Sequence, residues 1–212
     1  MSLFVAVSLF EIVAEFTQNI FLTSILKPFI LPLLLGIYLT KSTSKSVLYI
    51  LAIVINWIAN ILFLFEHSKY ITLAAIFFIF SKLFVVAKVY KEIKLPSLFP
   101  FIIGTIPFLF LFIYLNFLIF QDIDFQTFVI TIIHSVVMSL MGGIALGNYI
   151  MRNDKVSKFL LVSALFYAFN ILFLGIKFYY IDLSFLKPLS MVFFILGHFS
   201  LLQFILLSER AK

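Results

Sequence analysis

Long apolar stretches separated by short polar breaks dominate this chain of 212 residues and restrict it to one kind of fold. A helix that crosses a bilayer needs about 20 mostly apolar residues. The stretches are continuous in Leu, Ile, Phe and Val, without the alternation of a lipid-facing strand, so they predict helices rather than barrel strands. We therefore expect an all-α polytopic membrane protein, a bundle of eight transmembrane helices in a single integral membrane domain over residues 1–212. The expected spans lie near residues 2–22, 28–40, 46–65, 70–90, 98–120, 126–150, 156–180 and 184–207.

Each break between two spans is too short to hold a soluble domain. We expect the first break at Lys27 and Pro28, because proline is tolerated in the first turn of a helix. Glu11 and Glu15, together with the lack of a basic leading segment, argue against a cleavable signal peptide, so we expect the first span to be retained. The other breaks are expected at residues 41–46, 66–69, 91–96, 121–124, 152–158 and 182–184.

Composition supports a membrane location and excludes several functions. Hydrophobic residues make up 64% of the chain and charged residues 11%, whereas soluble proteins contain roughly 50% hydrophobic and roughly 25% charged residues. The mean hydropathy is +1.23. No cysteine is present, which excludes disulfides, thiolate nucleophiles and Cys-ligated metal clusters. The sequence also lacks the motifs of soluble serine hydrolases, P-loop proteins and dinucleotide-binding enzymes. We expect no cofactor and no metal.

The distribution of Lys and Arg predicts the orientation, because cytoplasmic loops collect basic residues. Ten basic residues lie on the side that holds the C-terminus and the breaks after the second, fourth and sixth spans, and four lie on the other side. We therefore expect both termini to be cytoplasmic, in the cytoplasmic (inner) membrane of a bacterium. Because the charge is spread over short loops facing an anionic leaflet, we expect no nucleic-acid partner. The ten are Lys41, Lys45, Lys88, Lys91, Lys94, Arg152, Lys155, Lys158, Arg210 and Lys212, and the four are Lys27, Lys69, Lys177 and Lys187.

Ionisable and amide side chains inside the spans predict a polar interior. A charged residue at the centre of a membrane helix costs ~2.5–3.5 kcal/mol on insertion scales. Glu11 and Glu15 share one helix face at i, i+4 spacing, and Asn19 continues it. At 1.5 Å of rise per residue, the polar residues of the different spans fall in one middle zone, so we expect a polar layer near or just beyond the midplane. The residues placed at this depth are Glu15, Asn60, Lys82, His134, Asn170 and His198, and Glu11, Asn56 and Gln203 are further polar residues of the same spans.

Structural roles are the alternative for the same residues. The amides can form ordinary hydrogen bonds between helices, at about 0.6 kcal/mol each. Lys82 can extend toward the cytoplasmic side, and the two histidines of the spans can be satisfied interior side chains without a metal. Separately, Gly142, Gly143 and Gly147 predict a close approach between the sixth span and a neighbouring helix.

Short segments in a characteristic order carry a family resemblance. They are Lys27-Pro28 at the second span, Ala59-Asn60-Ile61-Leu62 in the third, His134 to Met141 with Ala145 in the sixth, Ser163-Ala164-Leu165-Phe166 with Phe169-Asn170 in the seventh, and Gln203 with Ser208 in the eighth. Their order and spacing resemble the YhhN-like lysoplasmalogenase family over nearly the whole chain. The resemblance implies an eight-helix membrane hydrolase that cleaves the vinyl ether bond of lysoplasmalogens, releasing a fatty aldehyde and a glycerophospho-headgroup.

The chain departs from the family pattern at the positions that carry the chemistry. The resemblance implies Asp at the positions of Asn60 and Asn170, His at Lys82 and Tyr at His134. Vinyl ether hydrolysis requires an acid that protonates the alkene carbon and a group that activates water, and carboxylates suit both roles. An amide suits neither. We therefore expect an intramembrane pocket for a lysophospholipid-like amphiphile, a membrane lipid or lysolipid, with hydrolysis lost or greatly altered.

The expected pocket is an elongated cavity with a polar end and apolar walls. Its polar end is expected to contain Asn60 and Asn170, with a headgroup-binding set of Lys82, His134, His198 and Gln203. Because a buried ammonium needs an acceptor, we also expect Glu11 or Glu15 within reach of Lys82.

Two other functions remain open. One is an active lysoplasmalogenase-type hydrolase in which Glu11 or Glu15 is the acid or base and His134 or His198 is its partner. The other is a small lipid transporter that uses the polar layer as its path. Transporters usually show internal repeats and broken helices, and the sequence contains no convincing duplication.

Overall fold

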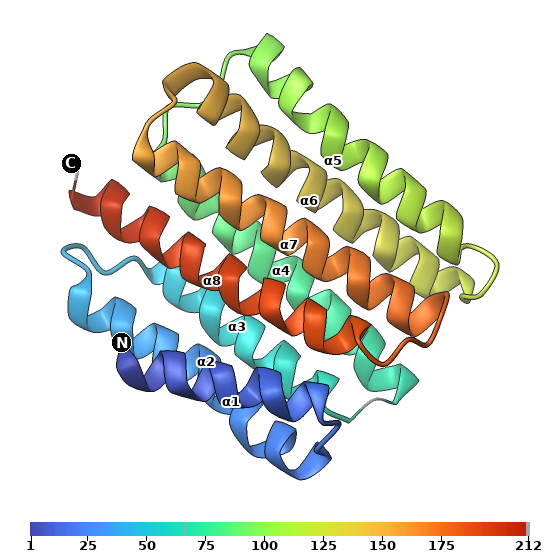
Figure 1. The fold of residues 1–212 in the computed structure, drawn as a ribbon. Helices are drawn as coiled ribbons and strands as arrows, with labels where there is room; N and C mark the ends of the chain where they lie inside the picture. The colour runs from blue at the N-terminus through green and yellow to red at the C-terminus, as the bar shows by residue number, and fades with distance from the viewer. Residues whose placement is uncertain (66, 211–212) are drawn as a thin grey trace. The chain divides into compact units, whose positions relative to one another are not determined.

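The structure, a computed structural model, describes residues 1–65 and 67–210. Over these residues the chain forms eight α-helices and no β-strand, which confirms the all-α prediction (Figure 1). Of the described helices, six are long and apolar enough to cross a membrane, and α3 is a shorter apolar helix. The eight are α1 (Ser2–Phe16), α2 (Ile20–Lys41), α3 (Val47–Phe63), α4 (Ser68–Glu92), α5 (Leu98–Ile119), α6 (Phe125–Arg152), α7 (Lys155–Tyr179) and α8 (Leu186–Arg210). Glu66 of the expected third break and Lys212 of the expected cytoplasmic set lie outside the described residues.

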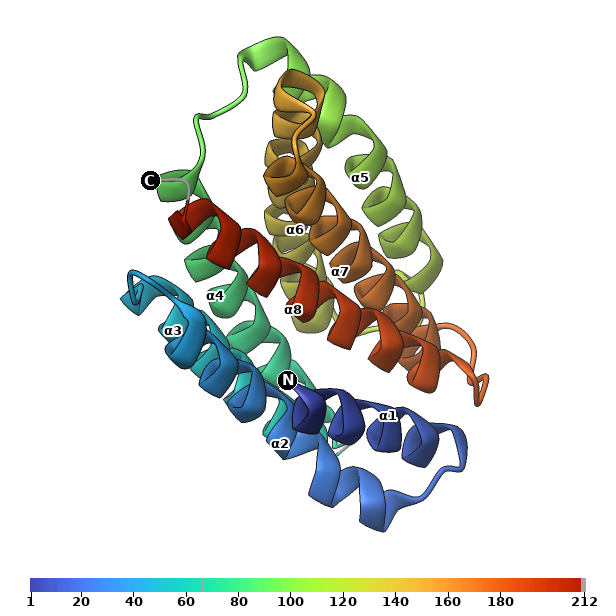
Figure 2. The same ribbon diagram turned by 60° about the vertical axis from the view of Figure 1, so that its left-hand side comes forward.

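The chain divides into two compact units, Met1–Lys88 and Val89–Lys212. We call them unit 1 and unit 2. In unit 1, α1 packs on α2 and α2 packs on α3. In unit 2, α5 packs on α6, α6 on α7, and α7 on α8, as Figures 1 and 2 show. α5 also contacts α7. The pairs α5–α6 and α7–α8 make the most extensive of these contacts.

The turn between α1 and α2 comes earlier than predicted. α1 ends at Phe16 after 15 residues, which is about 22 Å of helix, so the expected span 2–22 is too long. Asn19 is the N-cap of α2, and its side chain accepts a hydrogen bond from the N–H of Leu22 at 3.1 Å. Because a capping residue satisfies a free N–H at a helix start, Asn19 begins the second helix. The prediction that it continues the acidic face of the first helix is therefore wrong.

Pro28 and Pro32 lie inside α2, so the predicted break at Lys27 and Pro28 is wrong. Proline has no N–H, and each proline leaves the carbonyl four residues earlier without its helical donor. For Pro32 that carbonyl belongs to Pro28, and the indole N–H of Trp57 on α3 donates to it at 2.7 Å. A neighbouring helix thus supplies the hydrogen bond that α2 cannot supply to itself, which is how helices in lipid tolerate proline. The other six helices begin and end within three residues of their expected bounds.

Glycines bring α5 and α6 into close contact, as the sequence predicted for Gly142, Gly143 and Gly147. A Cβ placed on Gly104 of α5 would lie 2.8 Å from the carbonyl oxygen of Gly143 and 2.8 Å from the backbone nitrogen of Gly147. A Cβ on Gly142 would overlap the ring of Phe108. The two backbones can approach this closely only because these positions lack side chains, so the prediction is confirmed.

Aspartate caps mark the starts of α6 and α7, at two of the predicted breaks. The carboxylate of Asp124 accepts hydrogen bonds from the hydroxyl of Thr127 at 2.6 Å and from its N–H at 3.1 Å, and these bonds lower the pKa of Asp124. Asp154 accepts a hydrogen bond from the N–H of Ser157 at 2.7 Å, which lowers the pKa of Asp154. Ionised caps of this kind belong at the aqueous ends of helices.

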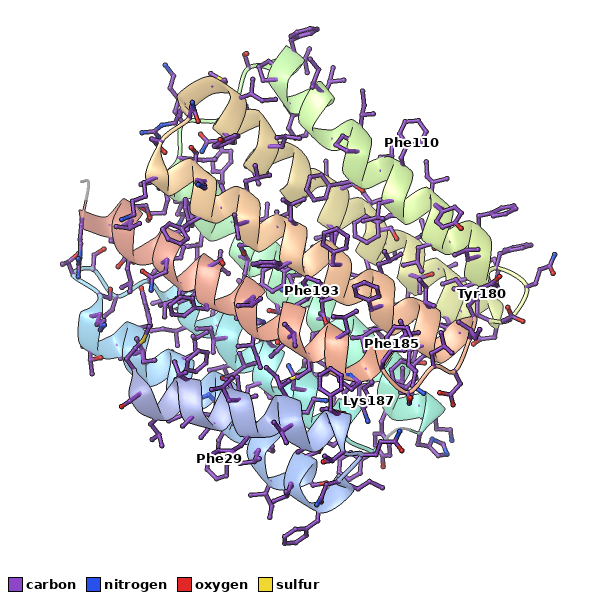
Figure 3. The ribbon with its side chains drawn as sticks, viewed as in Figure 1. Phe29, Phe110, Tyr180, Phe185, Lys187 and Phe193 are labelled. Atoms are coloured by element: carbon purple, nitrogen blue, oxygen red, sulfur yellow. The ribbon has the colours of Figure 1, made fainter. Side chains whose placement is uncertain are left out.

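Large apolar side chains cover the outside of the helices. Phe29 on α2 and Phe110 on α5 point away from the ribbon and are 56% and 69% exposed (Figure 3). Phe117, farther along α5, is 78% exposed. An apolar surface of this extent is unfavourable in water and ordinary in lipid. The described helices therefore have the length, composition and surface of a multi-pass membrane protein.

Candidate functional site

Unit 1 buries charged and amide side chains that are unusual in apolar helices. We use the name polar layer for Glu11, Glu15, Lys27, Asn56, Asn60, Ser81 and Lys82, all of which are buried. Together they come from all four helices of the unit: α1, α2, α3 and α4. Because each charged or amide group in a low-dielectric interior needs a compensating partner, their contacts decide what the layer can do.

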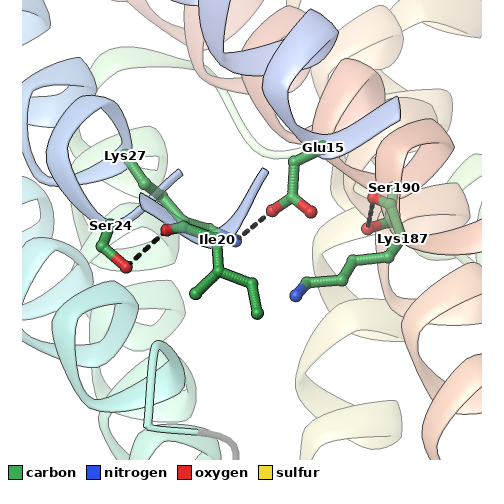
Figure 4. A network of polar contacts seen from close by, with 6 residues as sticks. All are labelled: Glu15, Ile20, Ser24, Lys27, Lys187 and Ser190. Carbon is green, nitrogen blue, oxygen red and sulfur yellow. Dashed lines mark hydrogen bonds and ion pairs between the residues drawn. The ribbon is translucent and has the colours of Figure 1, made fainter. Parts of the chain in front are cut away.

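Glu15 and Lys27 form a buried ion pair across the α1–α2 hairpin. Nζ of Lys27 lies 2.9 Å from Oε1 of Glu15 (Figure 4). Lys27 and Glu15 are 8% and 4% exposed. The sequence analysis placed Lys27 in a break between two helices, and that prediction is wrong, because Lys27 lies inside α2. The ion pair went unpredicted because the break was expected at Lys27 itself.

A chain of hydrogen bonds connects the amides of α3 to α4. Nδ2 of Asn60 donates to the carbonyl oxygen and to Oδ1 of Asn56, both at 2.8 Å. Nδ2 of Asn56 donates to Oγ of Ser81 at 3.2 Å, and Oγ of Ser81 donates to the carbonyl of Ala52 at 2.8 Å. A backbone carbonyl only accepts hydrogen bonds, so Asn60 must present its amide nitrogen to Asn56. This fixed donor determines the donor and the acceptor of each hydrogen bond from Asn60 to Ser81.

The contacts bring the polar groups of unit 1 to one level. Lys27 of the ion pair is adjacent to Pro28, whose carbonyl accepts the hydrogen bond of Trp57. Trp57 in turn follows Asn56, which donates to Ser81 on α4. The Glu15–Lys27 ion pair and the Asn56–Ser81 hydrogen bond therefore lie at similar heights, on either side of the contact between Trp57 and Pro28.

Lys82 follows Ser81 on α4 and is buried, at 4% exposed. The sequence analysis gave extension of the Lys82 side chain toward the cytoplasmic side as a structural alternative. The burial of Lys82 shows that its side chain does not reach the surface of the protein. Glu11, one turn before Glu15 on α1, is completely buried. The expectation that Lys82 lies within reach of Glu11 or Glu15 stays a prediction.

The remaining expected site residues belong to unit 2. His198 on α8 is 3% exposed, and its ring centroid lies 5.0 Å from that of Tyr167 and 4.5 Å from that of Phe194. Close by, the hydroxyl of Ser163 donates to the carbonyl of Gly197 at 3.0 Å and ties α7 to α8. His198 is thus an interior histidine packed by aromatic rings.

Asn170 and Gln203 are both half-buried but stand at different levels of unit 2. Asn170 follows Phe169, whose ring centroid lies 5.4 Å from that of Phe193 on α8. Gln203 is ten residues beyond Phe193 in the same helix, a distance of about 15 Å along the axis. The two amides therefore do not share one level.

A second hydrogen-bond network joins α5 to α6, and sequence reasoning missed its central residue, Asn116. Nδ2 of Asn116 donates to the carbonyl of Phe112 at 2.7 Å and to Oγ of Ser135 at 2.8 Å, while Oδ1 accepts from the hydroxyl of Thr131 at 3.0 Å. Such a satisfied amide is typical of hydrogen bonding between membrane helices. An asparagine inside an apolar stretch was the available signal. His134, which precedes Ser135, is half-buried.

Chemically, the polar layer of unit 1 offers charged donors and acceptors within apolar helices. Its two carboxylates and two ammonium groups can hold a charged ligand group or move a proton, whereas Glu15 is already engaged as the counter-ion of Lys27. Among the described residues, no three His, Asp or Glu side chains cluster so as to hold a metal ion.

Comparison with known proteins adds no relative: no family model, curated protein or solved structure matches this chain.

Proposed function

We propose that the chain is a multi-pass protein of a bacterial cytoplasmic membrane that binds a single-chain, lysophospholipid-like amphiphile at the polar layer of unit 1. The observation that carries the proposal is the buried ion pair of Glu15 and Lys27 at the level of the Asn56–Ser81 hydrogen bond. An amphiphile needs polar partners for its headgroup next to apolar surface for its tail. The apolar helices around the layer provide that surface.

We further propose that all eight helices cross the membrane. α1 and α3 are 15 and 17 residues long, about 22 and 25 Å, which is shorter than a hydrocarbon core of about 30 Å. Short helices are accommodated by local thinning of the bilayer. The ion pair with Lys27 compensates the charge of Glu15 near the end of α1, which favours insertion of the α1–α2 hairpin as a pair of helices.

Reporter fusions test this topology. Lys27 and Lys88 are buried in the structure, and without these two nine basic residues remain on one side against three on the other, so the asymmetry keeps its direction. Fusions after Lys41, Lys94 and the C-terminus are expected to report a cytoplasmic location, and a fusion at Asp122 a periplasmic one. A fusion before Ser2 is the sharpest control, because it reads periplasmic if α1 does not cross. A cytoplasmic signal at Asp122 contradicts the eight-span arrangement.

The resemblance to YhhN-like lysoplasmalogenases supports a lysolipid as the ligand, and Asn60 supports a loss of the vinyl ether chemistry. Asn60 donates two hydrogen bonds to Asn56, and an Asp at this position has no hydrogen to donate when ionised. A carboxylate there would face the carbonyl oxygen of Asn56, and the Asn56 amide would have to turn to donate to it. The polar layer is therefore built around an amide.

An active hydrolase is the second candidate, and the buried carboxylates of α1 favour it. Glu15 gives one oxygen to Lys27, so Glu11, completely buried, is the better acid or base. His134 and His198, the expected partners, lie in unit 2. A small lipid transporter is the third candidate, supported by the two prolines inside α2.

An aldehyde-release assay separates these functions. In liposomes containing lysoplasmalogen, the wild-type protein is expected to release little or no aldehyde, because Asn60 and Asn170 cannot transfer the required protons. The double variant Asn60→Asp/Asn170→Asp restores the family pattern and is expected to gain activity. Asn60→Asp/Asn116→Asp carries the same added charge and is expected to stay inactive. Robust wild-type turnover that is abolished by Glu11→Gln contradicts the loss of chemistry and favours the hydrolase.

A further inference from the structure

Lys27 has hydrogen-bond donors beyond the one that it gives to Glu15. An ammonium carries three N–H groups. Within the described part of the chain, Nζ of Lys27 donates one hydrogen bond, to Oε1 of Glu15 at 2.9 Å. The Lys27 side chain is 9% exposed, so it is nearly but not completely enclosed. An anionic group that reaches Lys27 therefore finds a buried positive charge with donors to offer.

A polar face of α2 leads from the start of the helix to Lys27. Asn19, Thr23 and Lys27 follow one another at intervals of four residues, so they share a face. Lys27 is seven residues from the first residue of α2, about 10 Å along the axis. On the far side of Lys27, the buried residues Leu31 and Leu34 make the helix apolar. The polar and apolar parts follow each other in the order that a headgroup and its tail require.

We propose that Lys27 binds the anionic group of the amphiphile, a phosphate or carboxylate, and that Glu15 is the counter-ion from which this group displaces it. The inference rests on the proposed function and names the residue that selects the headgroup. It assigns to Lys27 the role that the sequence analysis gave to Lys82. Lys27 has an anionic partner both before and after this exchange, so its own buried charge is never left unpaired.

Opposite responses of the two partners distinguish this role from a structural one. Glu15→Gln removes the charge that competes with the ligand, while its amide oxygen still accepts a hydrogen bond from Lys27. Affinity for an anionic amphiphile is expected to increase about tenfold. Lys27→Gln removes a charge-assisted hydrogen bond and is expected to decrease that affinity about tenfold. An ion pair with only a structural role would give no gain in affinity in either variant.

Trp57 provides a local optical probe for the experiment. It is the only tryptophan of the chain, and its indole N–H donates to the carbonyl of Pro28, the residue after Lys27. Its fluorescence can be followed in the full-length protein in nanodiscs of zwitterionic lipid, titrated with lysophosphatidic acid, with monoacylglycerol of the same acyl chain, and with inorganic phosphate. Lys69→Gln, the same loss of charge at an exposed position, is the matched control.

We expect the wild-type protein to bind lysophosphatidic acid, Glu15→Gln to bind it more tightly and Lys27→Gln to bind it more weakly. The affinity for monoacylglycerol is expected to be the same in all variants, and Lys69→Gln is expected to change neither affinity. Lys27→Arg is expected to keep most of the affinity, because it keeps the charge. Saturable binding of inorganic phosphate with the same two shifts would identify free phosphate instead of a lipid headgroup and overturn the lipid assignment. If wild-type protein binds both amphiphiles but Glu15→Gln does not tighten lysophosphatidic acid, the role of Lys27 is wrong and the proposed function stands. If neither amphiphile binds to wild-type protein, the proposed function itself fails.

Discussion

Glu15→Leu is expected to lower the free energy of unfolding by about 3–5 kcal/mol, because it leaves the ammonium of Lys27 buried without its counter-ion. The double variant Glu15→Leu/Lys27→Leu removes both charges and is expected to lose much less. Replacing a whole buried ion pair with apolar side chains is often neutral, whereas removing one partner is costly. In lipid the contrast should be large, since leucine is the ordinary residue of a membrane helix.

Unfolding of the reconstituted protein by a denaturing detergent measures this difference, with the coupling of the pair taken from a double-mutant cycle. Arg152 and Asp154 form a matched control pair at 3.1 Å with side chains that are 46% and 36% exposed. Arg152→Gln is expected to cost less than about 1 kcal/mol, because solvent screens an exposed ion pair. A double variant that is as unstable as Glu15→Leu would show that the pair is not what stabilises the α1–α2 hairpin.

The sequence was sufficient for the helical class and for six of the helices, because long apolar stretches carry local information about length and period. It also predicted the tight packing at Gly142 and Gly143, since glycine pairs in an apolar stretch have few other uses. The polar residues of unit 1 were identified individually from their cost in lipid. What spacing alone could not provide was their partners.

The errors come from contacts between helices that are distant in the chain. Proline usually marks a break, and the hydrogen bond that replaces the donor missing at Pro32 comes from Trp57, 29 residues from Pro28. The real turn depends on a cap at Asn19, a residue whose position in an apolar stretch resembled a polar face. Because the turn comes before Asn19, Lys27 lies in a helix and not in a loop, and it can pair with Glu15.

Gly104→Ala is expected to lower the free energy of unfolding, because α5 and α6 pack closely at Gly104. Gly36→Ala in α2 is expected to have the opposite effect or none. A methyl group on Gly104 would lie 2.8 Å from the backbone of Gly143 and of Gly147, and backbone atoms cannot turn away as a flexible side chain can. Gly104→Ala must therefore push α5 and α6 apart. The expected loss is about 1–3 kcal/mol, the usual cost of overpacking.

Gly36→Ala is the matched control, because nothing lies within 4 Å of a Cβ placed there. In the middle of α2 the added methyl group should only reduce the freedom of the unfolded chain, which stabilises a helix by about 0.5–1 kcal/mol. The same change from glycine to alanine is thus expected to lower the stability of the protein in α5 and to leave it unchanged or raise it in α2. Separation of the helices should also weaken the hydrogen bond of 2.8 Å between Asn116 and Ser135, so Gly104→Ala and Asn116→Val should lose less together than the sum of their separate effects. Equal stability of Gly104→Ala and Gly36→Ala would mean that α5 and α6 do not depend on the close approach of their backbones.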